Sequence, residues 1–356
     1  MLITPAIVAL QGIALSVAGA VLLASGFAGR ILRRWDIHSG SELQLRLERQ
    51  TYLISTLLGF ALGAELLSLL LFVHTAESLS SQFVGAMCAT GVLNVNGFGF
   101  PTLLLKITVF FLAALWLLLN RVDNRGYDYP LVRVKYGLLL VLAPLTLAEG
   151  VVQTGYFLGL TPEVITSCCG SLFSSDSKGV AAELAGLPPG PTLALFYAMA
   201  GLILMSGGWL LRALTPNASL PHPRPLSQRE RGADGRGEIA ALLFATLSLL
   251  GFAVAIAAII AFLALYVYEN PNHHCPSCLL KVGYDYVGYA LYLPLFTAAA
   301  VGLSAGVIAP FRRIPSLHAV IPGEVRRLTG LALAGFGLFY ALATWLVLRS
   351  NLILLG

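Results

Sequence analysis

Eight long apolar runs constrain what this chain of 356 residues can fold into. A helix needs roughly 20 residues to cross about 30 Å of hydrocarbon, and the runs are of that order. They lie near Ala6–Ala28, Tyr52–Val73, Pro101–Leu119, Tyr136–Leu160, Pro191–Leu211, Ile239–Tyr266, Tyr286–Pro310 and Leu328–Leu348. Their polarity does not alternate, which favours helices over the short strands of a membrane barrel. We therefore expect an all-α, polytopic membrane protein with about eight transmembrane helices in one bundle.

Composition supports the same class. Hydrophobic residues make up 57% of the chain and charged residues 11%, whereas charged residues make up about 25% of a typical soluble domain. No loop is long enough for a sizeable soluble domain, so we predict that residues 1–356 form a single transmembrane domain. The loop 215–238 contains the polar run PHPRPLSQRERGADGRG. Because such a run buries too little apolar surface to order itself, we predict a disordered cytoplasmic insertion there.

Lysine and arginine are distributed unevenly over the connecting loops. Nearly all of the 22 basic residues fall in the loops that follow the first, third, fifth and seventh runs. The alternate loops, around residues 74–100, 161–190 and 267–285, hold only Lys178 and Lys281. By the positive-inside rule the basic loops are cytoplasmic, so both termini lie outside. We expect a bacterial inner-membrane protein whose basic balance reflects topology in the lipid bilayer and no nucleic-acid partner.

All five cysteines fall in the three outer loops, which are then periplasmic: Cys88, Cys168, Cys169, Cys275 and Cys278. The last two belong to the run HHCPSC, which starts at His273. Cys-x-x-Cys spacing allows a short disulfide with reactive thiols, and it equally suits two ligands of a metal site beside His273 and His274. A structural disulfide in an oxidising compartment is a third interpretation. Five cysteines cannot all pair within one monomer, which favours exchange chemistry or metal binding.

Three ionisable residues lie inside the apolar runs: Glu65, Lys106 and Glu149. A charge at the bilayer centre costs at least about 2.5 kcal/mol, so such groups face the bundle interior and pair with one another. We therefore predict that Lys106 contacts Glu65 or Glu149. The cluster is either a structural ion pair or a proton relay between the outer thiols and a cofactor such as a quinone.

Tyrosines surround the HHCPSC run. They are Tyr266, Tyr268, Tyr284, Tyr286, Tyr289 and Tyr292. Tyrosine rings prefer the headgroup layer with their hydroxyls in water, so we interpret this group as an aromatic belt.

The first function class is an envelope thiol–disulfide oxidoreductase that passes electrons from a periplasmic thiol protein to a lipid-soluble acceptor such as a quinone. In general layout, a Cys-x-x-Cys pair at the outer face with further cysteines in a neighbouring loop, the chain resembles the vitamin K epoxide reductase and DsbB groups. Span count and loop lengths differ from those groups. In this interpretation Cys275 and Cys278 are the membrane-proximal catalytic pair, and Cys88 with Cys168 or Cys169 is the shuttle. His273 or His274 tunes the thiolates.

The second class is a soft-metal protein, either a transporter or an assembly factor that works with a periplasmic metal carrier. Thiolates of Cys275 and Cys278 with His273 or His274 would bind copper, zinc or mercury, because soft ligands select soft ions. A non-catalytic membrane subunit stapled by disulfides is the remaining alternative.

Overall fold

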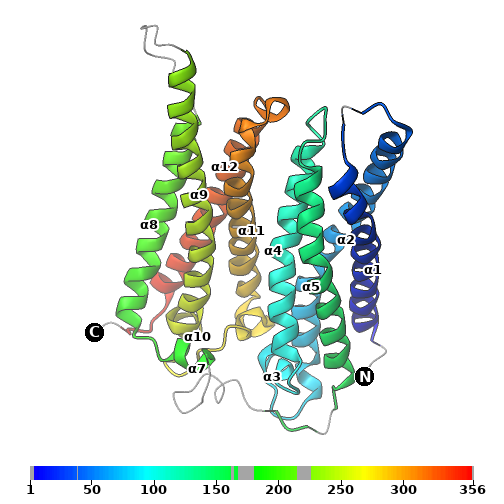
Figure 1. The fold of residues 1–356 in the computed structure, drawn as a ribbon. Coiled ribbons are helices and arrows are strands. Elements are labelled where there is room, and N and C mark those ends of the chain that lie inside the picture. The colour runs from blue at the N-terminus through cyan, green and yellow to red at the C-terminus, as the bar shows by residue number, and fades with distance from the viewer. Residues whose placement is uncertain (1–3, 38, 162–163, 167–179, 215–225, 355–356) are drawn as a thin grey trace. The chain divides into compact units, whose positions relative to one another are not determined.

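The computed structural model describes residues 4–37, 39–161, 164–166, 180–214 and 226–354 (Figure 1). These residues are overwhelmingly helical, and no strand occurs among them. Eight of the helices are long and apolar enough to cross a membrane, which confirms the predicted all-α, polytopic fold. The chain divides into two compact units, Met1–Cys169 and Gly170–Gly356. That the whole chain forms one domain stays a prediction.

The first unit contains four spanning helices. Its elements are α1 (Pro5–Arg34), α2 (Glu42–Leu79), the 3₁₀ turn η1 (Ser80–Gln82), the short α3 (Ala89–Leu93), α4 (Gly99–Asp123) and α5 (Val132–Leu158). Helix α1 packs on α2 and α5, and α4 packs on the same two helices. The hydroxyls of Thr4 and Ser41 accept backbone hydrogen bonds and so cap the starts of α1 and α2. Within this unit, α3 lies at the end that holds the N-terminus (Figure 1).

The second unit contains the other four spanning helices. Its elements are α7 (Val180–Ala185), α8 (Pro189–Ala213), α9 (Leu226–Ala258), the π-helical η2 (Ile259–Leu263), α10 (Ala264–Tyr268), η3 (Cys278–Leu280), η4 (Val282–Tyr284), α11 (Val287–Ile308), η5 (Ala309–Arg313), η6 (Pro315–Leu317) and α12 (Ile321–Arg349). Neighbouring helices pack in the order α12, α8, α9, α11 and back to α12. Of the predicted insertion 215–238, residues 215–225 lie outside the described residues and α9 begins at Leu226. Its disorder stays a prediction.

Small residues set the spacing between α9 and α11. A Cβ atom on Gly306 would lie 2.3 Å from the Cβ of Ala245 and 2.6 Å from the carbonyl oxygen of Ala241. A Cβ on Gly302 would lie 2.3 Å from Ser248 Oγ. Lipid is as apolar as a leucine side chain, so close backbone approach is a main source of helix association in a membrane.

The substitution Gly306→Ala is expected to destabilise the second unit by about 1–3 kcal/mol, because its methyl group would overlap backbone as well as side chain. Thermal unfolding of the full chain in detergent measures the effect. The matched control is Gly337→Ala in α12, where an added Cβ meets nothing within 4 Å. Equal melting temperatures for the two variants would contradict close packing at Gly306.

Candidate functional site

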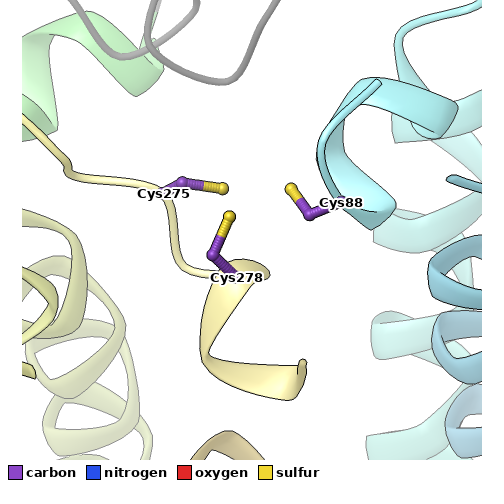
Figure 2. A group of neighbouring side chains, drawn as sticks. All are labelled: Cys88, Cys275 and Cys278. Atoms are coloured by element: carbon purple, nitrogen blue, oxygen red, sulfur yellow. The ribbon is translucent and has the colours of Figure 1, made fainter. Parts of the chain in front are cut away.

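The sharpest group of reactive side chains in the second unit is the Cys275–Cys278 pair, in the loop between α10 and α11. Both side chains are buried, at 0% and 3% exposure, and both are thiols. Their sulfur atoms lie within 4.8 Å of one another and project from the same side of the loop (Figure 2). A pair at this distance needs only a small movement to reach the roughly 2.05 Å bond of a disulfide.

Two tyrosine hydroxyls hold the backbone of this pair. Tyr268, the last residue of α10, donates to the carbonyl oxygen of Cys275 at 2.6 Å. Tyr292, in the second turn of α11, donates to the carbonyl oxygen of Pro276 at 3.0 Å. The aromatic-belt interpretation gave no such role to these two residues. No periodicity in the sequence could reveal it, because the contact depends on the path of the loop.

The two histidines of the HHCPSC run have different surroundings. His274 Nδ1 lies 2.9 Å from the carbonyl oxygen of Ile260, in the π-helical stretch. A carbonyl can only accept, so Nδ1 carries a proton. The ring of His273 lies against that of Tyr268, with centroids 4.2 Å apart. Among the described residues, neither imidazole joins Cys275 and Cys278 in a candidate metal-ligand group. A metal role for His273 and His274 stays a prediction.

The ends of the loop are held in unusual backbone conformations. Glu269, Asp285 and Tyr286 have φ angles of 50°, 53° and 54°, in the left-handed region. Such conformations cost of order 1 kcal/mol or more for residues with a side chain and persist only where contacts enforce them. Two nitrogens of Asn351, in the backbone and the side chain, donate to the Glu269 carboxylate at 2.9 and 3.0 Å. These contacts connect the start of the loop to the segment that follows α12.

At the other end, Gly288 lets the loop pack directly on α11. A Cβ atom there would lie 2.9 Å from the backbone carbon of Leu279, in the η3 turn that begins at Cys278. Close by, burial and then the charge of the Cys278 thiolate raise the pKa of Tyr284.

Cys88 belongs to the first unit, where it precedes α3. Its side chain is fully buried and is a thiol. The carboxylate of Glu77 accepts from the backbone nitrogen of Ala89 at 2.7 Å, which holds the start of the short helix. Gly91 approaches Ala86 so closely that a Cβ atom would lie 2.8 Å from its Cα. The other two predicted site cysteines, Cys168 and Cys169, lie outside the described residues.

A second buried group lies inside the first unit and joins three helices. Lys106 Nζ on α4 lies 2.6 Å from Glu149 Oε1 on α5 and 3.6 Å from Glu65 Oε1 on α2. It also donates to Ser68 Oγ at 3.0 Å. The predicted contact of Lys106 with a glutamate is therefore confirmed, and Lys106 contacts both. Its role as a proton relay stays a prediction.

Another buried ion pair was missed from the sequence. Lys135 precedes the predicted apolar run Tyr136–Leu160, but it lies in the first turn of α5, where Nζ is 2.6 Å from Asp123 Oδ2 and 2.8 Å from Asn120 Oδ1. A cavity of about 200 Å³ adjoins it, with Trp35 and Ser55 among the lining residues. Hydropathy alone cannot distinguish a loop lysine from one whose ammonium turns back into the helix bundle.

No protein-family model, curated protein or solved structure matches this chain. Three buried thiols occur among the described residues, and they separate by unit into the Cys275–Cys278 pair and Cys88.

The double substitution Tyr268→Phe with Tyr292→Phe is expected to loosen the thiol loop, since each lost hydrogen bond is worth about 1 kcal/mol. Alkylation of Cys275 and Cys278 in membranes should then accelerate about thirtyfold, because the two bonds together contribute about 2 kcal/mol and 1.4 kcal/mol is a factor of ten in an opening equilibrium. Tyr127→Phe, which changes a hydroxyl on an 84% exposed ring, is the control. Unchanged alkylation rates would show that the hydroxyls do not hold the loop.

Replacement of Lys106 by Met is expected to destabilise the first unit by about 3–5 kcal/mol, because it leaves two buried carboxyl groups without their counter-ion. Glu149→Gln retains the Lys106–Glu65 contact and should cost less. Thermal unfolding and the yield of folded protein in detergent compare the two variants. A milder effect for Lys106→Met than for Glu149→Gln would contradict the central place of the ammonium.

Proposed function

We propose that the chain is a membrane thiol–disulfide oxidoreductase in which Cys275 and Cys278 form the redox-active pair. The single observation that carries this proposal is the closeness of the two Cys-x-x-Cys thiols. They lie in a loop whose carbonyl oxygens accept hydrogen bonds from the hydroxyls of Tyr268 and Tyr292. A short disulfide can close and reopen there without rearrangement of the helices.

Cys88 is the third thiol of the proposed centre. Four spanning helices separate it from Cys275 along the chain, and an even number returns the chain to the same side of a membrane. Three cysteines can form one disulfide and leave one thiol, and intramolecular exchange requires a thiol beside a disulfide.

The proposed reaction is a two-electron exchange. Oxidation of the Cys275–Cys278 dithiol forms one S–S bond and releases two electrons and two protons, and a quinone-type acceptor takes up both to become a quinol. The Cys88 thiolate then attacks one sulfur of that disulfide and displaces the other as a thiolate. A dithiol of a periplasmic protein resolves the mixed disulfide and leaves with the disulfide bond. Cys168 or Cys169 is proposed to carry the exchange between Cys88 and that protein.

The charge pattern supports the orientation. Loops that hold the cysteines carry almost no lysine or arginine, so we place them in the periplasm of a bacterial inner membrane. That compartment is oxidising, and it supplies the thiol substrates that such an enzyme needs.

A trapping experiment tests the exchange. A protease site placed within residues 215–225 allows the chain to be cut between Cys88 and Cys275. In Cys278→Ser, the remaining Cys275 thiol should form a lasting disulfide with Cys88 under oxidant, so the two fragments stay joined on a non-reducing gel. Adding Cys88→Ser should separate them.

The same thiols should follow the acceptor in unaltered protein. Alkylation of membranes quenched in acid should find Cys275 and Cys278 oxidised when quinone is present and reduced when quinone is withheld. A pair that stays oxidised under both conditions, and whose reduction unfolds the protein, would identify a structural disulfide instead.

A second candidate function is soft-metal binding, which is favoured by the two neighbouring buried thiols of Cys275 and Cys278. Thiolates select ions such as Cu(I), Zn(II) or Hg(II). Purified protein should then hold one such ion per chain, lose it to a thiol-competing chelator, and lose it in Cys88→Ser. Protection of the thiols by metal, with no dependence on quinone, would favour this function over redox exchange.

A further inference from the structure

The cluster of Glu65, Lys106 and Glu149 has an unbalanced charge. Each of the three helices α2, α4 and α5 contributes one ionisable group, and all three groups are at most 2% exposed. With both carboxyls ionised and the amine protonated, the cluster carries a net charge of one negative unit. Helix α1, which also packs on α5, contributes Gln11 near this level and no charged group before Arg30. Among the described residues, α1 therefore supplies no counter-charge to the cluster.

Hydrogen-bond donors are also too few. The ammonium of Lys106 has three donors, and Glu149 Oε1, Ser68 Oγ and Glu65 Oε1 surround it. Ser68 has one hydroxyl proton, for which the backbone oxygen and Oε1 of Glu65 compete at 2.8 Å each. Glu149 Oε2 is buried and has no hydrogen-bond partner among the described residues. One added proton on Oε2 would turn this acceptor into a donor and make the cluster neutral.

We propose that Glu65, Lys106 and Glu149 form a binding site for a single exchangeable proton, carried by the Glu149 carboxyl and stabilised by sharing Lys106 with Glu65. Binding joins a proton from water to a carboxylate oxygen and involves no electron transfer. Burial of a net charge in the bilayer interior is costly, and neutralisation by a proton removes that cost. The inference does not depend on the thiol chemistry.

Polar side chains lead from this site toward the N-terminal end of the unit. Gln153 lies one helical turn beyond Glu149 on α5, so the two share a face. Its amide nitrogen donates to Gln11 Oε1 at 2.7 Å, and Gln11 donates to Thr154 Oγ1 at 3.1 Å. Gln153 Oε1 is buried and, like Glu149 Oε2, has no partner among the described residues. We assign the proton's access to this side of the cluster because the amides continue its polar surface toward the partly exposed Gln11 and Thr154.

Infrared spectroscopy of the full chain in lipid tests the site, since a protonated carboxyl has a C=O band separate from those of carboxylates and amides. Unaltered protein at neutral pH should show one such band from this cluster. Charge neutrality predicts that either Glu149→Gln or Glu65→Gln abolishes it, because the remaining carboxylate and Lys106 already balance. In Lys106→Met both carboxyls must be protonated, so the band should grow about twofold. Glu42→Gln, which removes an exposed carboxyl, should change nothing.

Three outcomes would overturn the proposal. The first is the absence of a band that depends on Glu149, which would make the cluster a simple ion pair. The second is loss of the band in Glu149→Gln alone, which would mean an isolated protonated acid without proton sharing. The third is a sodium-dependent rise in thermal stability that Glu149→Gln removes, without a carboxyl band, which would assign the site to a metal cation. If Lys106→Met does not fold, the two glutamine variants still decide between these outcomes.

The route has its own measurement. Transfer of the sample to D₂O shifts the carboxyl band as the proton exchanges. Gln153→Leu should keep the band and slow its shift at least tenfold, and an unchanged exchange rate would contradict access from the side that Gln153 lines.

Discussion

A hydrocarbon interior offers a buried polar group no water to bond with, and this constraint explains the placement of polar side chains in both units. In the first unit a single ammonium, that of Lys106, joins α2, α4 and α5 through their acidic and hydroxyl groups. In the second unit the irregular backbone around Cys275 is acceptable because tyrosine hydroxyls satisfy its carbonyls. Polar contacts therefore fix the positions of helices and loops that apolar packing alone does not specify.

The two units divide the chemistry between them. Ionisable groups within the spans of the first unit form two buried ion pairs, one at Lys106 and one at Lys135. The second unit instead carries the Cys-x-x-Cys pair in a loop outside its spans, with aromatic and imidazole rings around it. Oxidation of a dithiol releases protons as well as electrons, so a membrane enzyme of the proposed class needs groups that handle each.

Sequence patterns predicted the features that depend on composition over many residues. A helix crosses a bilayer only if its apolar run is long enough, so the sequence predicted all eight spans. It also predicted that Lys106 contacts a glutamate, because few acidic residues lie inside the spans. The roles of Tyr268 and Tyr292, the proton position on His274 and the burial of Lys135 were not predictable in that way. Each depends on one side chain meeting one carbonyl or carboxylate, and that meeting is determined by the path of a loop or by a helix start. The site roles of Cys168 and Cys169 remain predictions from the sequence alone.

The π-helical stretch Ile259–Leu263 has a consequence for the helix that follows it. Successive residues of an α-helix differ by about 100° around the axis, and a π-helical turn accommodates one residue more than an α-helical turn. The stretch therefore turns α10 by about that angle relative to a continuous α-helix, and α10 ends at Tyr268, whose hydroxyl donates to the carbonyl oxygen of Cys275. Deletion of one residue between Ile259 and Leu263 would restore regular helix geometry and aim Tyr268 elsewhere. The π-helical stretch thus sets the rotation of α10, the helix that leads into the loop with Cys275 and Cys278.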